Sequence, residues 1–192
     1  WGPARDALAA MFATRPSGPV AVRAASAALA MGDPTSALEF VAQGGALLTP
    51  VAARSQLLPL ELKALSQLGR AREVEARLAA YAPQLDPAML KGYARVVAWA
   101  WIRAGNVGKA RAALDGASGD DEDEVTAWLA LFDGDLVKAR NGLRHPAEVT
   151  PEIVNAMALL GRTKADTSRA IGAAFTALAR NDSLQAAQRF EQ

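Results

Sequence analysis

The amino-acid sequence predicts an all-α protein, on the evidence of its composition, its helix-ending residues and a turn motif that recurs along the chain. Alanine and leucine supply about a third of the 192 positions, and both are strong helix formers. β-Branched and aromatic residues, which favour strands, are sparse. With 51% hydrophobic and 21% charged residues, the chain has the composition of a folded globular protein rather than that of a disordered one.

The recurring motif places a small residue five positions after a glycine or asparagine that ends a helix. Glycine and asparagine tolerate the left-handed backbone conformation found there, and the Asp or Asn that often follows can cap the next helix. A small side chain at the fixed offset lets the second helix approach the first closely. Clear copies run from Gly32 to Ala37, from Gly105 to Ala110 and from Gly134 to Ala139, and weaker ones run from Gly69 to Val74 and from Asn181 to Ala186. Each copy predicts a helical hairpin.

Capping residues and prolines mark further helix starts. Thr49-Pro50, Asp86-Pro87 and Thr150-Pro151 each set a capping residue before a proline, which is favoured in the first helical turn. Pro59 is expected to kink or split its helix, because proline removes an internal hydrogen bond. The predicted helices, in chain order, cover residues 3–14, 19–31, 34–43, 50–68, 71–81, 87–104, 107–115, 121–132, 136–144, 151–161, 167–180 and 183–191.

These helix pairs resemble the tetratricopeptide repeat family, whose units are antiparallel helix pairs of about 34 residues. The resemblance is best over residues 91–118. There Ala98 stands at the family's small position, Trp101 at the aromatic position three residues further on, and Ala110 and Leu114 at core positions of the second helix. A generic helical bundle is the alternative, because hairpins and alanine contacts also occur in bundles.

The resemblance implies a single domain over residues 1–192, built as a right-handed superhelical stack of antiparallel helix hairpins, which is an α-solenoid. The turns are unevenly spaced, and the repeat register becomes irregular from about residue 145. In such a stack the first helices line a concave surface, and their exposed residues are the natural contacts for a partner. The candidate partner-binding residues at these positions are Lys63, Gln67, Arg95, Trp99, Arg103, Glu124 and Trp128.

Aromatic and arginine side chains are enriched in binding hot spots, so the central candidates are Arg95, Trp99 and Arg103, with Ile102 on the same helix face. The alternative interpretation makes Trp99 and Trp128 part of the core between repeats, since large aromatic residues are usually buried. In that case Arg95 and Arg103 are solvated or paired with nearby acids.

Several chemical functions are disfavoured by the residues present. The chain has no cysteine, so disulfides, thiolate nucleophiles and the usual structural zinc sites are excluded. Its formal net charge is +1, which gives no broad field for nucleic acid. The acidic run Asp120–Glu124 is expected to be a solvated helix start rather than a metal site, and His145 is expected at a helix end without a nucleophile beside it. We therefore expect no catalytic, metal or cofactor site.

The sequence is thus expected to belong to a non-enzymatic scaffold that binds a protein or peptide partner on its concave face, without inserting into a membrane. One alternative is the noncatalytic helical arm of a larger enzyme or assembly of a bacterial cell envelope. The start at Trp1 and the lack of a signal-like segment favour a mature exported protein or an excised piece, with a slight preference for the periplasm or cell envelope. A further alternative is an RNA-binding helical repeat.

Overall fold

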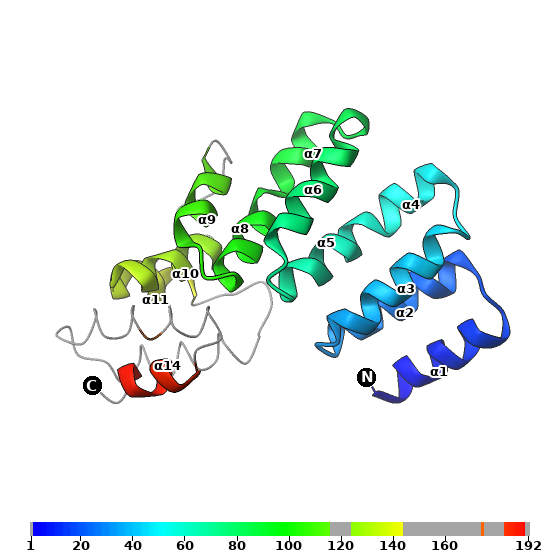
Figure 1. The fold of residues 1–192 in the computed structure, drawn as a ribbon, viewed down its shortest axis with the longest axis horizontal. Helices are drawn as coiled ribbons and strands as arrows, with labels where there is room; N and C mark the ends of the chain where they lie inside the picture. Colours follow the sequence, from blue (N-terminus) through cyan, green and yellow to red (C-terminus); the bar gives the residue numbers. More distant parts are fainter. Residues whose placement is uncertain (1, 116–123, 144–173, 175–182, 191–192) are drawn as a thin grey trace. The chain divides into compact units, whose positions relative to one another are not determined.

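Every secondary-structure element of the described residues is helical (Figure 1). The structure, a computed structural model, describes residues 2–115, 124–143, 174 and 183–190. The α-helices are α1 Gly2–Thr14, α2 Gly18–Ala30, α3 Pro34–Gly45, α4 Pro50–Gln56, α5 Leu58–Gln67, α6 Ala71–Tyr81, α7 Pro87–Gly92, α8 Ala94–Arg103, α9 Val107–Leu114, α10 Glu124–Asp133, α11 Leu136–Gly142 and α14 Ser183–Phe190, and a 3-10 turn, η1, covers Ala82–Gln84. The all-α prediction is confirmed for these residues.

Two predicted helices are each divided into two. The helix predicted over 50–68 splits at Leu57, and Pro59 lies in the first turn of α5, as its missing amide hydrogen favours. The helix predicted over 87–104 also breaks, between α7 and α8 at Tyr93. This second break was missed, although Gly92 immediately before it disfavours a helix interior. The helices predicted over 151–161 and 167–180, with Thr150-Pro151, Asn181 and His145, lie outside the described residues.

The four glycines of the turn motif adopt one conformation. Their φ angles are 74° at Gly32, 67° at Gly69, 74° at Gly105 and 74° at Gly134. In each turn the amide of the next residue donates to a carbonyl five residues back: Asp33 to Ala28 at 2.9 Å, Arg70 to Leu65 at 2.9 Å, Asn106 to Trp101 at 2.8 Å and Asp135 to Ala130 at 2.9 Å. This bond and the left-handed glycine are the features of a Schellman motif, which satisfies carbonyls at the helix end.

Side chains cap the helix that follows in three of the four turns. Asp33 accepts from the amide of Ser36, Asn106 from that of Lys109 and Asp135 from that of Lys138, at 3.1, 3.0 and 3.0 Å. The fourth turn carries Arg70, which makes no such bond. The predicted capping by Asp and Asn is confirmed, and Thr49 and Asp86 likewise accept amide hydrogens at the starts of α4 and α7.

The small residue after each turn is completely buried. Ala37, Val74, Ala110 and Ala139 all have 0% of their surface exposed. Each lies on the second helix of a pair whose two members contact one another: α2 with α3, α5 with α6, α8 with α9 and α10 with α11. The residue seven positions before each glycine is buried to the same extent, at Ala25, Leu62, Ala98 and Ala127. The offset predicted from the sequence therefore marks helix–helix contact points.

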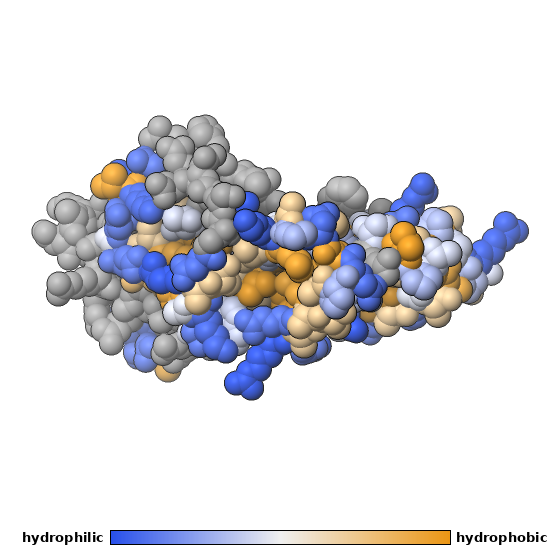
Figure 2. All heavy atoms as spheres, turned by 90° about the horizontal axis from the view of Figure 1, so that it is seen from above, coloured by the Kyte–Doolittle hydropathy of each residue, from blue (hydrophilic) through white to orange (hydrophobic). Residues whose placement is uncertain are grey.

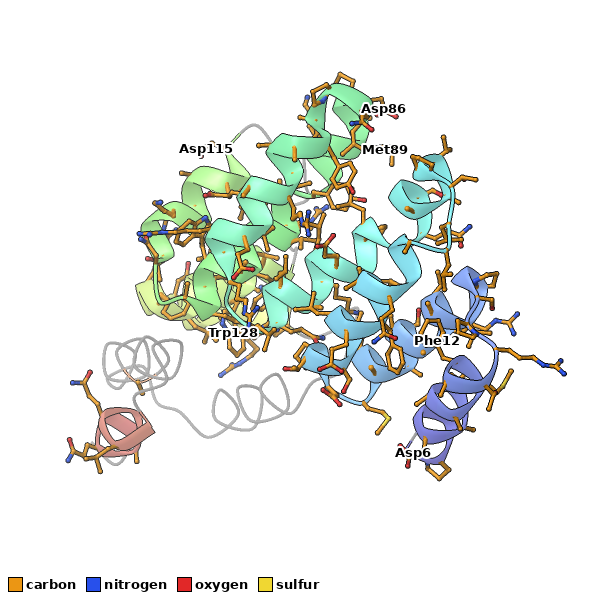
Figure 3. The ribbon with its side chains drawn as sticks, turned by 45° about the vertical axis from the view of Figure 1, so that its right-hand side comes forward. Asp6, Phe12, Asp86, Met89, Asp115 and Trp128 are labelled. Carbon is orange, nitrogen blue, oxygen red and sulfur yellow. The ribbon has the colours of Figure 1, made fainter. Side chains whose placement is uncertain are left out.

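The chain divides into two compact units, Trp1–Leu90 and Lys91–Gln192. In the first unit, α5 contacts both α2 and α3, while α1 packs on α2. Phe12 on α1 meets Phe40 on α3 edge to face, with ring centroids 6.1 Å apart, and Figure 3 shows Phe12 on the side of α1 that faces these helices. A core of alanine, leucine and valine side chains from α2, α3 and α5, with Leu57, lies between them.

In the second unit, α10 contacts both α8 and α9. The first helix of the later pair thus lies against both helices of the earlier pair, the same relation that α5 has to α2 and α3 in the first unit.

None of the described helices combines the length and hydropathy needed to cross a lipid bilayer.

The glycine conformation of the turns can be tested at Gly32. A methyl group there would meet no atom within 4 Å, so Gly32→Ala tests the positive φ angle alone. We expect the free energy of unfolding to fall by about 1–2 kcal/mol. The control is Gly45→Ala, because Gly45 ends α3 with helical geometry and also has open space around it. In urea denaturation, the Gly45→Ala variant should be as stable as the unmodified chain or more stable by up to about 1 kcal/mol. Equal losses of stability in the two variants would contradict the left-handed conformation of Gly32.

Close packing of α2 against α3 can be tested at Gly44, the residue before the control position Gly45. A Cβ atom added to Gly44 would lie 2.6 Å from the Cβ atom of Ala21, closer than two carbon atoms can approach. Gly44→Ala should lower the free energy of unfolding by about 1–3 kcal/mol. A Gly44→Ala variant as stable as Gly45→Ala in the same denaturation experiment would mean that the two helices are further apart.

Candidate partner-binding surface

The seven candidate residues are distributed over both units. Lys63 and Gln67 lie on α5 of the first unit. Arg95, Trp99 and Arg103 lie on α8 of the second, and Glu124 and Trp128 lie on α10. The side chain of Glu124 is outside the described part. The structure brings three candidates together, namely Trp99, Arg103 and Trp128, and the complete predicted groove stays a prediction.

Trp99 is the centre of this three-residue cluster. Its ring centroid lies 5.7 Å from that of Trp128, with the ring planes tilted by 52°. The guanidinium carbon of Arg103, one helical turn after Trp99, lies 5.1 Å from the centroid of the Trp99 ring. Contact between an arginine and an aromatic face is attractive, because the ring carries negative charge on its faces. The stacking therefore restricts where the Arg103 guanidinium can lie.

The two tryptophans occupy the same position in two successive helix pairs. Trp99 precedes Gly105 by six residues, and Trp128 precedes Gly134 by six. Their contact means that equivalent positions of α8 and α10 are neighbours within the second unit. The contact therefore places equivalent positions of two successive helix pairs side by side. The sequence indicated this neighbourhood only through the spacing of the glycines.

The candidate residues on α8 and α10 differ in exposure to solvent. Trp128, labelled in Figure 3, is only 8% exposed, whereas Trp99 and Arg103 are half-buried and Arg95 is exposed. Ile102, expected on the same face, is 1% exposed. Burial of Trp128 fits the interpretation that it belongs to the core between repeats. Of the four residues expected on this face of α8, Arg95, Trp99 and Arg103 keep exposed surface.

The two candidate residues on α5, Lys63 and Gln67, are half-buried. Within the described part of the chain, the side-chain oxygen of Gln67 is inaccessible to solvent and accepts no hydrogen bond. An unsatisfied buried acceptor costs free energy. On the same helix, the Glu61 carboxylate bonds the Arg77 guanidinium of α6 at 2.7 Å. This helix pair is therefore joined by an ion pair that sequence reasoning did not identify.

Two further contacts in the second unit were also missed. The Lys109 ammonium lies 4.1 Å from the centroid of the Trp101 ring, and the Arg111 guanidinium bonds the Asp133 carboxylate at 2.6 Å. Both residues are one position away from the buried Ala110. The turn motif places Lys109 and Arg111 on either side of the buried Ala110. It does not identify their partners, because these depend on how α9 packs against α8 and α10.

The described residues contain no group of three or more histidine, cysteine, aspartate or glutamate side chains suited to hold a metal ion. Residues 120–123 of the acidic run and His145 lie outside the described part. Burial raises the pKa of the Tyr93 phenol, which favours its neutral form. On the face drawn in Figure 2, hydrophilic and hydrophobic residues are interspersed.

Comparisons of the chain with protein-family models, with curated proteins and with solved structures gave no significant match.

Stability measurements can distinguish the buried Trp128, as a core residue, from the half-buried Arg103. Trp128→Ala should lower the free energy of unfolding by about 3–5 kcal/mol, because it empties a buried aromatic site. Arg103→Ala removes one stacking contact of a half-buried side chain and should cost about 1 kcal/mol or less. Chemical denaturation followed by circular dichroism measures both. A larger loss at Arg103 than at Trp128 would contradict this assignment.

Proposed function

We propose that this chain is a tetratricopeptide-like α-solenoid that acts as a non-enzymatic scaffold and binds a protein segment. The observation that carries the proposal is the contact between Trp99 and Trp128 at equivalent positions of successive helix pairs. Helix pairs that meet in register form a continuous row of first helices, and such rows serve repeat proteins as extended binding surfaces.

The repeated turn geometry supports the same architecture. Four glycines with nearly equal φ angles, each followed by a completely buried residue five positions later, give four helix pairs with one common internal arrangement. The first helix of a later pair also contacts both helices of the preceding pair in each unit. Units that share a geometry and a stacking relation build a solenoid when they are repeated.

On this proposal, the partner contacts α8 through Arg95, Trp99 and Arg103. Arg103 is stacked on Trp99, which lowers the conformational entropy that its guanidinium loses on binding. The exposed part of the indole offers apolar area, and the guanidinium offers directed hydrogen-bond donors. A peptide that presents an apolar side chain next to a carboxylate or a backbone carbonyl satisfies both. The remaining candidates, Lys63 and Gln67 in the first unit and Glu124 in the second, stay predicted contacts for the partner.

This proposal is tested by selecting peptides from a random displayed library on the full chain. Peptides that bind should lose about tenfold or more in affinity to the Arg95→Ala/Arg103→Ala double variant, because truncated hot-spot residues typically cost more than 1 kcal/mol each. The matched control is Arg23→Ala/Arg72→Ala, which removes two exposed arginines from α2 and α6. Fluorescence anisotropy should show a change below about twofold for this control.

If every selected peptide binds both double variants equally, the α8 surface is not the binding site. Single-stranded RNA tested in the same way distinguishes the nucleic-acid alternative. A salt-sensitive RNA complex that the Arg95→Ala/Arg103→Ala variant abolishes would replace the protein-binding proposal.

A further inference from the structure

The proposed α8 site, formed by Arg95, Trp99 and Arg103, lies against a residue of the next helix pair. The ring centroid of Trp99 is 5.7 Å from that of Trp128 on α10. Trp128 is only 8% exposed, so it offers a partner almost no surface of its own. The residue through which Trp128 reaches the α8 site is therefore Trp99.

Trp128 lies in a well-packed part of the second unit. The residues on either side of it in α10, Ala127 and Leu129, are 0% and 4% exposed, and α10 contacts both α8 and α9. Buried side chains in such surroundings are close-packed and have few alternative positions. The packing of α10 therefore determines where the Trp128 ring lies.

Trp99 has more freedom than Trp128, because it is half-buried. A side chain at the surface of a helix can adopt more than one staggered rotamer, and only some rotamers bring the Trp99 ring against Trp128. The same ring carries the guanidinium of Arg103, whose central carbon lies 5.1 Å from the ring centroid. One orientation of the Trp99 ring thus makes both contacts.

We propose that Trp128 is a positioning residue of the α8 site. It selects the Trp99 rotamer on which Arg103 stacks, and it thereby presents the indole and the guanidinium to a protein segment in one arrangement. This inference rests on the proposed function of the α8 site. Preorganised groups lose less conformational entropy when a partner binds, so the side chain at position 128 affects the affinity although it is buried.

The same contact couples the partner to the packing of α10 on α8. A segment that binds the selected Trp99 rotamer best also stabilises the contact between Trp99 and Trp128, because the coupling of two such events is reciprocal. The pair formed by α8 and α9 does not contain this contact by itself. The binding unit on this proposal is therefore two successive helix pairs, α8 with α9 and α10 with α11.

The positioning role is tested first without a partner, by NMR of the Arg103 side chain in the full chain. Protons over the face of an aromatic ring resonate upfield, so these signals report the stack on Trp99. Trp128→Leu removes the ring and should move the signals towards their positions in a Trp99→Leu variant, whereas Trp128→Phe should keep them near those of the unmodified chain. The control Leu129→Ala empties a buried site about 100° away around α10 and should leave the signals unchanged.

Arg103 signals that stay in place in Trp128→Leu overturn the proposal, as do signals that move equally far in Leu129→Ala, because a residue that only fills the core would behave in this way. Circular dichroism verifies that each variant is folded. If Trp128→Leu is unfolded, nuclear Overhauser effects in the unmodified chain decide. Contacts of the Trp99 ring with both Trp128 and Arg103 are then expected, and a ring that populates several orientations overturns the proposal.

The second test measures binding, with displayed peptides that lose affinity to Arg95→Ala/Arg103→Ala. Trp128→Leu should weaken these peptides by about three- to tenfold, the range expected for the loss of one aromatic pair. Trp128→Phe and Leu129→Ala should each change the affinity by less than about twofold. Unchanged affinity in Trp128→Leu overturns the proposal. If no selected peptide depends on Arg95 and Arg103, the proposed function of the α8 site fails, whereas the NMR comparison still tests positioning by Trp128, so the two failures are distinguishable.

Discussion

The left-handed glycine that ends the first helix of each pair is the constraint on which the rest of the structure depends. At φ angles near +70°, the chain leaves one helix and enters the next within a few residues. The hydrogen bond to the carbonyl five residues back fixes the direction of that exit. The buried residue five positions later can then contact the first helix in all four pairs. A non-glycine residue in this conformation would be strained.

The candidate partner-binding residues of α8 and α10 follow from this repeated geometry. The positions two and six residues before the glycine lie on one side of the first helix of a pair, and on α8 they carry Arg103 and Trp99. The positions four and six residues after the glycine lie on either side of the buried residue of the second helix, and on α9 and α11 they carry a lysine and an arginine. Different side chains at equivalent positions thus give each helix pair its own chemistry on a similar backbone, and we base the proposed α8 site on this difference.

The sequence predicted the all-α class, the four glycine turns and the buried residues at the fixed offset. These features depend on local backbone preference and on side-chain size, which a single sequence contains. The helix break at Tyr93 was missed, because Gly92 is tolerated within some helices and the tertiary packing decides its effect. Ile102 was expected on the exposed α8 face but is buried, since the neighbouring helices determine how much of that face they cover. The contacts of Lys109 and Arg111 depend on the same packing.

The contact between Trp99 and Trp128 is the most direct test of register between successive helix pairs, the relation on which the proposed scaffold depends. A double-mutant cycle with Trp99→Leu and Trp128→Leu measures their interaction as the non-additive part of the free energies of unfolding. Tilted aromatic rings in contact predict a coupling of about 0.5–1.5 kcal/mol. Additive effects of the two substitutions, with both single variants folded, would contradict the packing of equivalent positions against one another.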